Sequence, residues 1–345
     1  MKFKPASFIK FLLLLVVAGG LLFFAFRGIR LNNVIQEMLR ANFFWLLLSV
    51  IFSVLALISR AYRWKLLIEP LGYSPRLKRT FYALMVGYFA NLAFPRLGEV
   101  TRCGTLNKTE SIPFPSLLGT VIVERAVDVI SLLICIILTI IIEYKRLGNF
   151  LTSKIINPII GKLEYALTSP VIIAAIIIII TLLLFAVRYL KKRARRTGRR
   201  SGLANFLKEL VKGIKSIARL KNPWQFVFHS VAIWVLYFFS AYVGLFALPA
   251  TMHLDLGAAL FILTLGGLGM SAPVQGGIGV YHLLVSQGLM LYGLTHQDGL
   301  AFATLVHASQ LAVVVLLGSA SLFLLFLENK KSMFRKSDLK SEIVS

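Results

Sequence analysis

The chain has 345 residues, of which 58% are hydrophobic, and a formal net charge of +24. Soluble domains are about half apolar, so this composition excludes an ordinary soluble protein and indicates an integral membrane protein. The basic residues gather in loops and tails, as the positive-inside rule requires, which argues against a nucleic-acid partner.

Nine apolar segments are candidates for entering the membrane. A run of about 20 apolar residues crosses the hydrocarbon core, and residues 171–187 approach this length without a charged residue. The first segment follows Lys2, Lys4 and Lys10 as in a signal peptide, but it is long and further spans follow, so we expect a retained helix. In chain order the segments are 8–26, 43–59, 81–94, 117–142, 171–187, 226–248, 258–272, 277–294 and 300–327.

Two of these segments, 81–94 and 258–272, are short and end in sequence rich in proline and glycine. A helix of about 14 residues reaches only about 21 Å, less than the core thickness of roughly 30 Å. We therefore expect broken or re-entrant helices, whose free backbone groups must be buried in protein or face a cavity. The residues expected at the two breaks are Pro95, Gly98, Pro273, Gly276, Gly277 and Gly279.

The distribution of lysine and arginine sets the expected orientation. Residues 188–221 contain thirteen basic residues and one acidic residue, whereas residues 222–329 contain no lysine or arginine. Because cytoplasmic loops are enriched in basic residues, we expect 188–221, the basic tail 328–345 and the N-terminus to be cytoplasmic. The expected location is the plasma (inner) membrane, crossed several times.

The expected fold is an all-α polytopic membrane protein with about 7–9 transmembrane or re-entrant helices. Residues 1–327 are expected to form a single membrane domain, with halves at roughly 43–142 and 224–327. Residues 202–221 carry apolar side chains at helical spacing and basic side chains opposite them. This pattern predicts an amphipathic helix on the inner membrane surface; a solvated cytoplasmic helix is the alternative.

The two breaks lie at matching positions of the halves. Trp45 precedes Pro95 by 50 residues, and Trp224 precedes Pro273 by 49 residues. The charge pattern orients the halves oppositely, which is typical of an inverted repeat with a binding site between its halves. Chance spacing in an apolar chain is the alternative.

Charged residues follow the first break directly. The planar guanidinium groups of Arg96 and Arg102 suit phosphate oxygens, and a helix that starts after Pro95 adds backbone N–H groups. We therefore expect a lipid headgroup site made of Arg96, Glu99, Arg102 and Asn91, with Asn91 also able to satisfy backbone groups freed by the break. The alternative is that the arginines extend to the membrane edge to reach water.

Three charged residues, Glu124, Arg125 and Asp128, lie inside the segment 117–142. Glu124 and Asp128 are four residues apart and share a helix face. A charge at this depth costs roughly 2.5–3.5 kcal/mol on insertion scales, so such residues usually face the protein interior or a cavity. We expect a polar path for a headgroup or for protons; the alternative is a buried ion-pair network with an arginine of the first break.

The second break offers neutral polar side chains. Gln275, His282, His307 and Gln310 are expected to form the facing side of the polar path. Histidine titrates near neutral pH and so offers a route to proton coupling. A hydrogen-bonded histidine inside a helix bundle is the alternative.

Other residues predict no additional site. Arg60, Arg63 and Trp64 end the second segment, where topology anchoring at the inner interface explains them. The enzyme motifs HExxH, CxxC, GxSxG and the P-loop do not occur. The five histidines and two cysteines lack close metal-ligand spacing. We therefore expect no enzyme activity, no metal and no cofactor.

Four motifs occur in order along the chain: RAYRWKLL at 60–67, NLAFPRLGEVTR at 91–102, ERAVD at 124–128 and PVQGGIGVYH at 273–282. In this order and spacing they resemble the lysylphosphatidylglycerol synthase transmembrane region family, a group of flippase-like membrane proteins. The resemblance extends from about residue 60 to residue 327.

The resemblance implies a membrane region that moves a charged, modified lipid across the bilayer. In the family's best-understood members this region is fused to an aminoacyl-transferase domain, which we do not expect here, so synthase activity is not transferred. The family's last motif often has a second proline and a following glutamate, where this chain has Gln275 and His282. A histidine can accept a proton or bind a ligand there, but it is not a fixed negative charge.

Three functions are consistent with these residues. The first is a flippase or transporter of an anionic or modified phospholipid or of a polyprenyl-phosphate-type lipid. The second is a membrane-embedded accessory protein for a separate lipid-modifying or envelope glycosyl-transfer enzyme. The third is a membrane enzyme with Glu124 or Asp128 as a base. The expected partners are membrane lipids, anionic in charge, with a second copy of the chain or a partner enzyme as further options.

Overall fold

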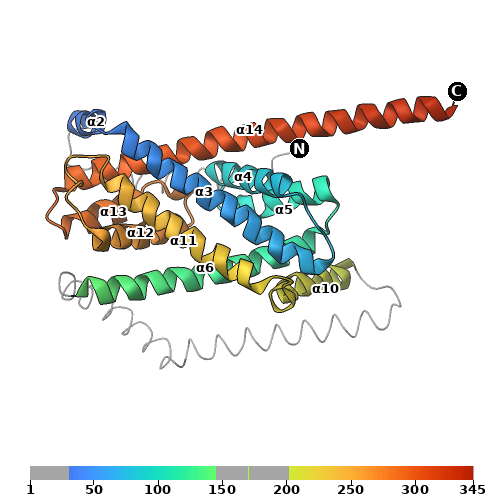
Figure 1. Ribbon diagram of the computed structural model, residues 1–345, viewed down its shortest axis with the longest axis horizontal. Coiled ribbons are helices and arrows are strands. Elements are labelled where there is room, and N and C mark those ends of the chain that lie inside the picture. The colour runs from blue at the N-terminus through green and yellow to red at the C-terminus, as the bar shows by residue number, and fades with distance from the viewer. Residues whose placement is uncertain (1–30, 145–169, 171–201, 345) are drawn as a thin grey trace.

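The computed structural model describes residues 31–144, 170 and 202–344, and every regular element in these ranges is a helix. The expected all-α membrane fold is therefore confirmed. The expected spans 8–26 and 171–187 lie outside the described residues, as do residues 188–201 of the basic loop 188–221. Figure 1 shows long helices crossing the molecule, with shorter helices grouped beside them.

The first half places two short helices between two long ones. The first long helix begins at Asn42, whose Oδ1 accepts the backbone N–H of Phe44 at 3.1 Å and so caps the helix. The elements are α2 (Leu31–Leu39), α3 (Phe43–Ile68), the 3-10 turn η1 (Glu69–Leu71), α4 (Leu77–Ala93), α5 (Leu97–Glu110) and α6 (Phe114–Ile142).

The second half repeats this order after a short docking helix. Its first short helix begins at Asp255, whose Oδ1 accepts the backbone N–H of Ala258 at 2.9 Å. The elements are α10 (Gly202–Ile214), η3 (Lys215–Arg219), α11 (Pro223–Leu245), α12 (Leu256–Ser271), η4 (Gln275–Gly277), α13 (Val280–Met290) and α14 (His296–Val344).

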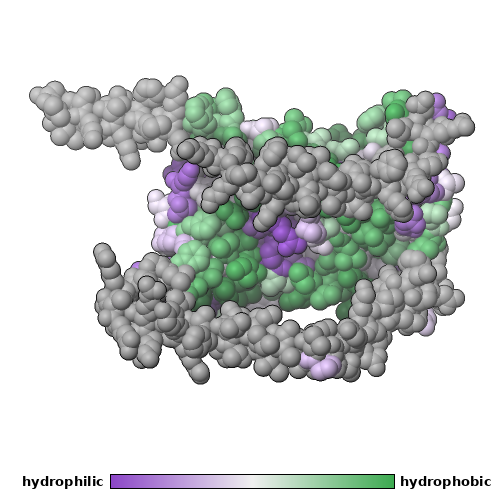
Figure 2. All heavy atoms as spheres, turned by 180° about the vertical axis from the view of Figure 1, so that it is seen from behind, coloured by the Kyte–Doolittle hydropathy of each residue, from purple (hydrophilic) through white to green (hydrophobic). Residues whose placement is uncertain are grey.

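Four helices of the described ranges are long and apolar enough to cross a membrane. Many of their large apolar side chains are exposed, as expected where the solvent is lipid. Figure 2 shows a face on which apolar residues cover most of the described surface around a hydrophilic patch near the centre. The four spans are Phe43–Leu71, Phe114–Ile142, Pro223–Leu245 and His296–Glu328.

The short helices form two hairpins, α4–α5 and α12–α13. The predicted short segment 81–94 is α4, which begins earlier, at Leu77, and is followed by α5 returning beside it. The prediction of a full span at 277–294 is wrong. α13 has 11 residues, or about 16 Å, and packs back against α12 because the chain turns at glycines with positive φ.

The predicted span 300–327 also differs at both ends. Helix α14 begins at His296 and continues without interruption to Val344, so the predicted tail 328–345 extends the last span as a helix. The predicted helix 202–221 is confirmed as α10, which tightens into the 3-10 turn η3 at Lys215.

The two halves pack as an inverted repeat would. α3 and α11 lie antiparallel along their length: Trp45 contacts Phe246 at one end, with ring centroids 5.1 Å apart, and Tyr62 contacts His229 at the other, at 4.4 Å. Between these contacts, Ser240 exchanges hydrogen bonds with Ser49. These antiparallel long helices are the expected arrangement of halves with opposite orientation.

Each hairpin also reaches into the opposite half. The first short helix of one half packs on the last long helix of the other: α4 on α14, and α12 on α6. The α12–α6 contact includes a hydrogen bond of 3.0 Å between the hydroxyls of Thr264 and Thr139. Figure 1 places α4 and α5 toward one end of the molecule and α12 and α13 toward the other. This reciprocal packing brings the two breaks into contact.

Candidate functional site

The first break lies between α4 and α5. α4 ends at Ala93 because Pro95 has no N–H to continue the helix. Arg96 then adopts a left-handed conformation with φ +63°, which costs a non-glycine residue about 1 kcal/mol. Oδ1 of Asn91 accepts the backbone N–H of Gly98 at 2.6 Å. This bond satisfies an N–H group at the start of α5, as predicted for Asn91.

The hairpin α4–α5 depends on a close glycine contact. A Cβ atom on Gly98 would collide with the carbonyl oxygen of Gly87 and would lie 2.6 Å from the amide nitrogen of Asn91. Only glycine lets the two backbones approach this closely. The contact fixes α5, and with it Arg102, against the inner side of α4.

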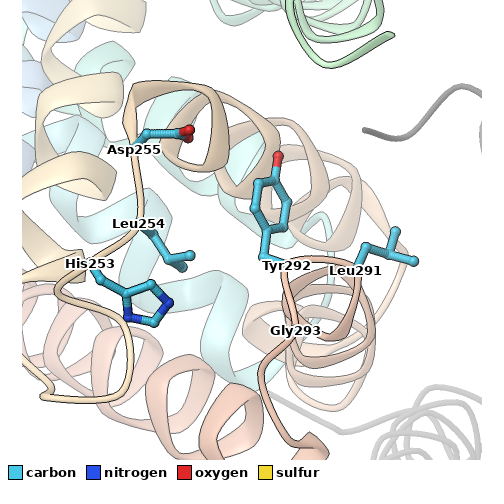
Figure 3. A pocket seen from close by; sticks show the side chains of 6 residues that line it. All are labelled: His253, Leu254, Asp255, Leu291, Tyr292 and Gly293. Carbon is cyan, nitrogen blue, oxygen red and sulfur yellow. The ribbon is translucent and has the colours of Figure 1, made fainter. Parts of the chain in front are cut away.

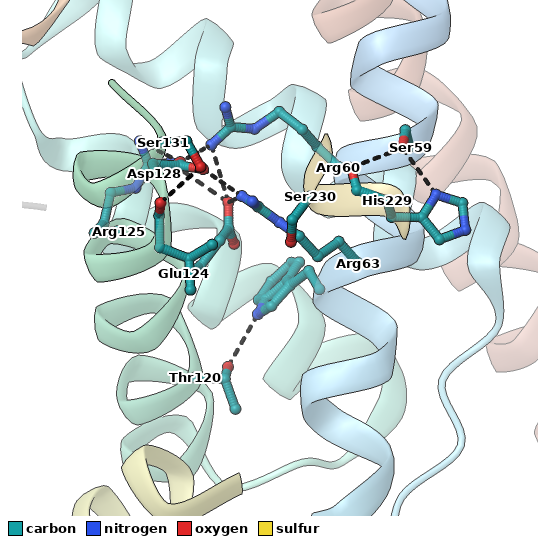
Figure 4. Close-up of polar contacts among 12 residues, drawn as sticks. Ser59, Arg60, Arg63, Thr120, Glu124, Arg125, Asp128, Ser131, His229 and Ser230 are labelled. Carbon is teal, nitrogen blue, oxygen red and sulfur yellow. Dashed lines mark hydrogen bonds and ion pairs between the residues drawn. The ribbon is translucent and has the colours of Figure 1, made fainter. Parts of the chain in front are cut away.

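Glu124 on α6 is the centre of a buried ion-pair network (Figure 4). Its side chain is fully buried. It accepts hydrogen bonds from Arg60 at 3.0 Å and from Arg102 at 2.9 Å. Nη2 of Arg63 lies 3.6 Å from the same carboxylate, and Nη2 of Arg125 lies 3.7 Å from it.

Asp128, one turn further along α6, extends the network. Arg60 and Arg63 each donate to one of its oxygens, at 2.5 Å, and Arg125 lies 3.8 Å away on the same helix. Figure 4 shows the two α3 arginines reaching across to the carboxylates of α6. The arginines on α3 are three residues apart and the carboxylates on α6 are four apart. Each pair therefore lies on one face of its helix, and the two faces meet.

Trp64 forms an apolar wall of this network. The guanidinium group of Arg102 lies over its ring, 4.7 Å from the centroid, a favourable cation–π geometry. The indole Nε1 donates to the hydroxyl of Thr120 at 3.0 Å. The tryptophan is fully buried and thus holds α3, α5 and α6 together beneath the charges.

The network contains more guanidinium groups than its carboxylates can satisfy. Arg60, Arg63, Arg102 and Arg125 face Glu124, Asp128 and Glu99, whose Oε1 lies 3.9 Å from Nε of Arg125. Within the described ranges, five buried nitrogens of these arginines and one oxygen, Oε2 of Glu99, have no hydrogen-bond partner. The nitrogens are Arg60 Nε, Arg63 Nε, Arg63 Nη1, Arg102 Nη2 and Arg125 Nε.

This surplus has a chemical meaning. A buried polar group without a partner costs about 1–3 kcal/mol, and more when it is charged. Four positive charges against three negative ones leave a net positive charge in a region of low dielectric. The unpaired N–H groups and the net positive charge both favour a bound anion with several acceptor oxygens. Guanidinium groups suit phosphate oxygens in charge and geometry.

The network has a closed interior and a more open edge. The side chains of Arg63 and Glu124 are fully buried, whereas that of Arg125 is 41% exposed and that of Glu99 is 26% exposed. An anion would therefore meet Arg125 and Glu99 before the deeper arginines.

Sequence reasoning missed two central members of this site. The interpretation of Arg60 and Arg63 as interface anchors is wrong, since both side chains are buried and pair with Glu124 and Asp128. The signal that would have found them is their three-residue spacing beside a carboxylate pair on another span. The ion-pair alternative for Glu124 is confirmed for Arg102.

The second break holds a neutral polar cluster. Nε2 of His307 lies 2.8 Å from the carbonyl oxygen of Gly276, a residue with φ +55°. Nδ1 of His282 accepts the backbone N–H of Gly279 at 3.3 Å. The two imidazole rings touch, with centroids 5.0 Å apart. The hydrogen-bonded alternative is thus observed for both histidines, which hold the turn in place.

Two side chains of this cluster have polar atoms without a hydrogen-bond partner among the described residues. Gln275 is 5% exposed, and neither its amide oxygen nor its amide nitrogen has a hydrogen-bond partner among the described residues. Nδ1 of the fully buried His307 is likewise without one. Gln310 lies one turn along α14 from His307 and is half-buried. A role for these side chains in a polar path stays a prediction.

The two breaks meet in the structure. Arg96, at the start of α5, donates from Nη2 to the carbonyl oxygen of Ser271, at the end of α12, over 3.3 Å. At the second break, a Cβ atom on Gly276 would lie 3.1 Å from Cδ2 of Leu92 on α4. Arg96 itself is exposed, so it lies outside the buried network that contains Arg102.

A separate cavity of about 370 Å³ lies at the loops of the second half. It is formed by the turn before α12 and the turn after α13 (Figure 3) and shares no residue with the arginine network. Its lining residues are His253, Leu254, Asp255, Leu291, Tyr292 and Gly293.

Comparison with known proteins assigns the chain to a family. The model of the lysylphosphatidylglycerol synthase TM region matches residues 11–318. The chain belongs to this family. The chain is also similar to the UPF0104 membrane protein MJ1595 of Methanocaldococcus jannaschii, with 34% identity over 103 residues. That match covers 29% of this chain and 31% of the relative, and no solved structure matches the chain.

Membership in the lysylphosphatidylglycerol synthase TM region family confirms the resemblance drawn from the four motifs. Three of those motifs, at 60–67, 91–102 and 124–128, meet in the arginine network. The fourth, at 273–282, forms the neutral second break. The first three motifs thus form one buried cluster, and the fourth contacts it only through the first break, at Leu92 and Arg96.

Proposed function

We propose that this membrane protein moves a phosphate-bearing lipid between the two leaflets, with the headgroup held at the buried arginine network beside the first break. The observation that carries the proposal is the surplus of buried guanidinium groups: five nitrogens without a hydrogen-bond partner, beside a net positive charge, among the described residues. A lipid phosphate would supply both the negative charge and the missing acceptors.

The arrangement of the network suggests an order of contacts. Arg125 and Glu99 form the exposed edge, so the phosphate would first replace Glu99 as a partner of Arg125. Arg60, Arg63 and Arg102 lie deeper and would hold the phosphate more tightly, because interactions between charges strengthen as water is excluded.

The carboxylates have a different role in this proposal. Glu124 and Asp128 each accept hydrogen bonds from two arginines, one on each oxygen, so both oxygens of each carboxylate already have a guanidinium partner. We therefore propose that they position the arginines and limit the net charge, and that neither acts as a catalytic base. Without such carboxylates, four buried guanidinium groups would repel one another.

The family also supports a lipid substrate. Its name refers to a synthase of a modified phospholipid, and paired interrupted helices between inverted halves are typical of transporters. The basic segments 188–221 and 328–345 support a proposed orientation with both termini in the cytoplasm and a location in the plasma (inner) membrane.

The proposal is tested by reconstituting the full chain in liposomes that contain a fluorescent phosphatidylglycerol. A membrane-impermeant reductant destroys the label in the outer leaflet, so inner-leaflet label is lost only as lipid crosses. We expect label loss in protein-loaded vesicles and about tenfold slower loss with Arg125→Gln, which corresponds to about 1.4 kcal/mol.

The matched control is Arg79→Gln. Arg79 also pairs with two carboxylates, Glu110 at 3.5 Å and Glu328 at 3.1 Å, and its side chain is 27% exposed, but it lies outside the network. It should transport at the wild-type rate. Equal rates in loaded and empty vesicles would overturn the proposal, and an enzyme that co-purifies with an inactive chain would favour the accessory role.

A further inference from the structure

Helix α10 presents three sides of different chemistry. One side packs on the first turns of α6: Gly213 lies so close to Gly119 that a Cβ atom on it would be 2.9 Å from Cα of that residue. Beside this contact, Ser116 donates a hydrogen bond of 2.7 Å to Glu209. A glycine and a carboxylate of α10 thus make the contact, which does not need the large apolar side chains of the helix.

The second side of α10 is apolar and exposed. Each large side chain on this side is 37–46% exposed. At about 100° per residue these side chains lie within an arc of about 140°, next to the side that packs on α6. Their exposure to water would be unfavourable, so this side favours an apolar environment. The residues are Phe206, Leu207, Val211 and Ile214.

The third side of α10 is basic. Lys208, Lys212 and Lys215 are exposed and lie within an arc of about 60° that is separate from the other two sides. The segment 188–221 contains one acidic residue, Glu209, which already accepts the hydrogen bond from α6 and lies 3.7 Å from Nζ of Lys212. Positive charge therefore prevails on this side, which suits a surface of negative charge.

The helix lies where membrane spans end. Ser116 is the third residue of the span Phe114–Ile142, and η3 leads from α10 to the span Pro223–Leu245. Trp224, at the start of that second span, is 83% exposed, and tryptophan is enriched at membrane–water interfaces. Figure 1 places α10 beside the ends of α3, α6 and α11. The helix is therefore at the level where the chain leaves the hydrocarbon core.

The boundary between lipid and water suits the two exposed sides together. A helix free in the cytoplasm would expose its apolar side to water, and a helix within the hydrocarbon core would bury its lysines at high cost. At the boundary, the apolar side enters the acyl chains while the lysines reach anionic headgroups. The apolar side remains free for this contact because docking on α6 does not use it.

We infer that α10 is anchored in the surface of the cytoplasmic leaflet by acyl chains and anionic headgroups, and that this anchor fixes the depth of the arginine network. Glu124 is eight residues beyond Ser116 on α6, or about 12 Å along the helix. This is less than half of the core thickness of roughly 30 Å. The network therefore lies in the half of the membrane next to α10. This inference does not depend on lipid transport.

The membrane contact is tested by electron paramagnetic resonance on the full chain in nanodiscs of phosphatidylcholine and phosphatidylglycerol. With Cys103 and Cys135 replaced by alanine, a spin label is attached to a cysteine at Val211 or at Lys212, one at a time. Oxygen concentrates among the acyl chains, whereas a nickel chelate stays in water. We expect oxygen to relax the label at 211 more than nickel does, and the reverse at 212.

Two other results at these positions would overturn the membrane contact. Nickel access that exceeds oxygen access at both 211 and 212 would indicate a solvated helix. Poor access of both reagents at 211 would indicate that a protein partner covers the apolar side.

A label at Ile122 measures the depth of the network. Ile122 lies within one turn of Glu124 and is 45% exposed. We expect this label to lie deeper than the label at 211 and short of the bilayer centre. A label at or beyond the centre would overturn the depth that we assign to the network.

Hydrogen exchange tests the contact with anionic headgroups. Peptides that cover 202–214 should exchange about fivefold more slowly in discs that contain phosphatidylglycerol than in phosphatidylcholine alone, because a basic residue near an anionic surface contributes about that factor. The double variant Lys208→Gln, Lys215→Gln should lose the difference. The control, Arg76→Gln with Lys78→Gln, removes two exposed charges outside α10 and should keep it. Equal exchange of the wild type in both lipids, or a difference that persists in the α10 variant, would overturn the headgroup contact.

Discussion

At the scale of single residues, the interior of this membrane protein is organised by buried charge. Glu124 is in contact with arginines from α3, α5 and its own helix, so one carboxylate ties three elements together. Burying an ion pair costs free energy. Removing one member of the pair costs more, because it leaves a buried charge without a counter-charge. The charged residues of the candidate site therefore also hold α3, α5 and α6 together.

Replacing Glu124 by glutamine should destabilise the protein strongly. The change leaves Arg60 and Arg102 without their shared charge partner, and removing one member of a buried pair costs about 3–5 kcal/mol. The midpoint of thermal unfolding, followed by tryptophan fluorescence in one detergent, measures this effect. Glu99→Gln is the control: its partly exposed pair with Arg125 spans 3.9 Å, so its loss should cost less than about 1 kcal/mol. Equal losses in both variants would contradict the network.

The glycine contact in the first hairpin gives a second residue-scale prediction. Gly98→Ala places a methyl group against Gly87 and Asn91, and such overpacking costs about 1–3 kcal/mol. Gly104→Ala lies on the same helix with open space around its Cβ position, so it should be neutral or stabilising by about 0.5–1 kcal/mol. Thermal unfolding of the two variants compares them, and equal midpoints would argue against the close contact of α4 and α5.

Sequence reasoning found some of these residues for a definite reason. Glu124 and Asp128 stand out because carboxylates are rare within an apolar span, and Asn91 stands out beside a helix-breaking proline. The sequence suggests that Arg60 and Arg63 are interface anchors, because basic residues near the end of a span commonly fix its orientation in the membrane. Only the packing of α3 on α6 distinguishes a buried arginine from an anchoring one.

At the scale of elements, the short helix α10 is docked firmly on the span that carries the carboxylates. Gly213 of α10 lies against Ser116 and Gly119 of α6, and Ser116 donates a hydrogen bond of 2.7 Å to Glu209. Apolar side chains of α10, including Val211, remain exposed. The helix thus joins the base of α6 to whatever covers this apolar face, and a membrane surface stays the predicted partner.

Gly213→Ala should release α10 from α6. The added methyl group would collide with the carbonyl of Ser116 and lie 2.9 Å from Cα of Gly119, so docking should weaken by about 1–3 kcal/mol. Hydrogen exchange followed by mass spectrometry should then show faster exchange in peptides that cover 202–214, with little change in α11. Unchanged exchange would mean that the glycine contact does not hold the helix.

The sequence also predicted most elements, and its errors have a physical cause. The length of continuous apolar runs identifies helices such as α3, α6 and α11, because a lipid-exposed span must be apolar along its length. It does not distinguish a span from a hairpin helix that is buried among other helices. The segment 277–294 was therefore extended through α13, whose length is set by the glycine turn at one end and the loop before α14 at the other.

At the scale of the whole molecule, the first short helix of each half packs on the last long helix of the other half. The long helices α3 and α11 lie antiparallel between them. The chemistry of the halves nevertheless differs: the first break is rich in arginine, and the second is neutral. Weak repeat spacing in the sequence predicted the symmetry, but the meeting of the breaks depends on packing between helices more than 170 residues apart.

Linking the two breaks should stop transport. If the headgroup enters between Arg96 and Ser271, these positions must separate during each cycle. Cysteines at both positions, in a chain with Cys103 and Cys135 replaced by alanine, allow a reducible cross-linker to join them. We expect lipid movement to cease on cross-linking and to return on reduction, while the single Arg96→Cys variant treated in the same way remains active. Undiminished movement in the cross-linked protein would exclude opening at this point.

The central claim is that a lipid phosphate lies against the surplus guanidinium groups of the network. Solid-state NMR tests it directly by measuring phosphorus–nitrogen dipolar couplings between bound lipid and isotope-labelled arginine side chains in membranes. We expect a short-range coupling in the wild-type protein that is lost in Arg125→Gln and retained in Arg79→Gln. A coupling that is absent, or that is unchanged by the Arg125 substitution, would contradict the claim.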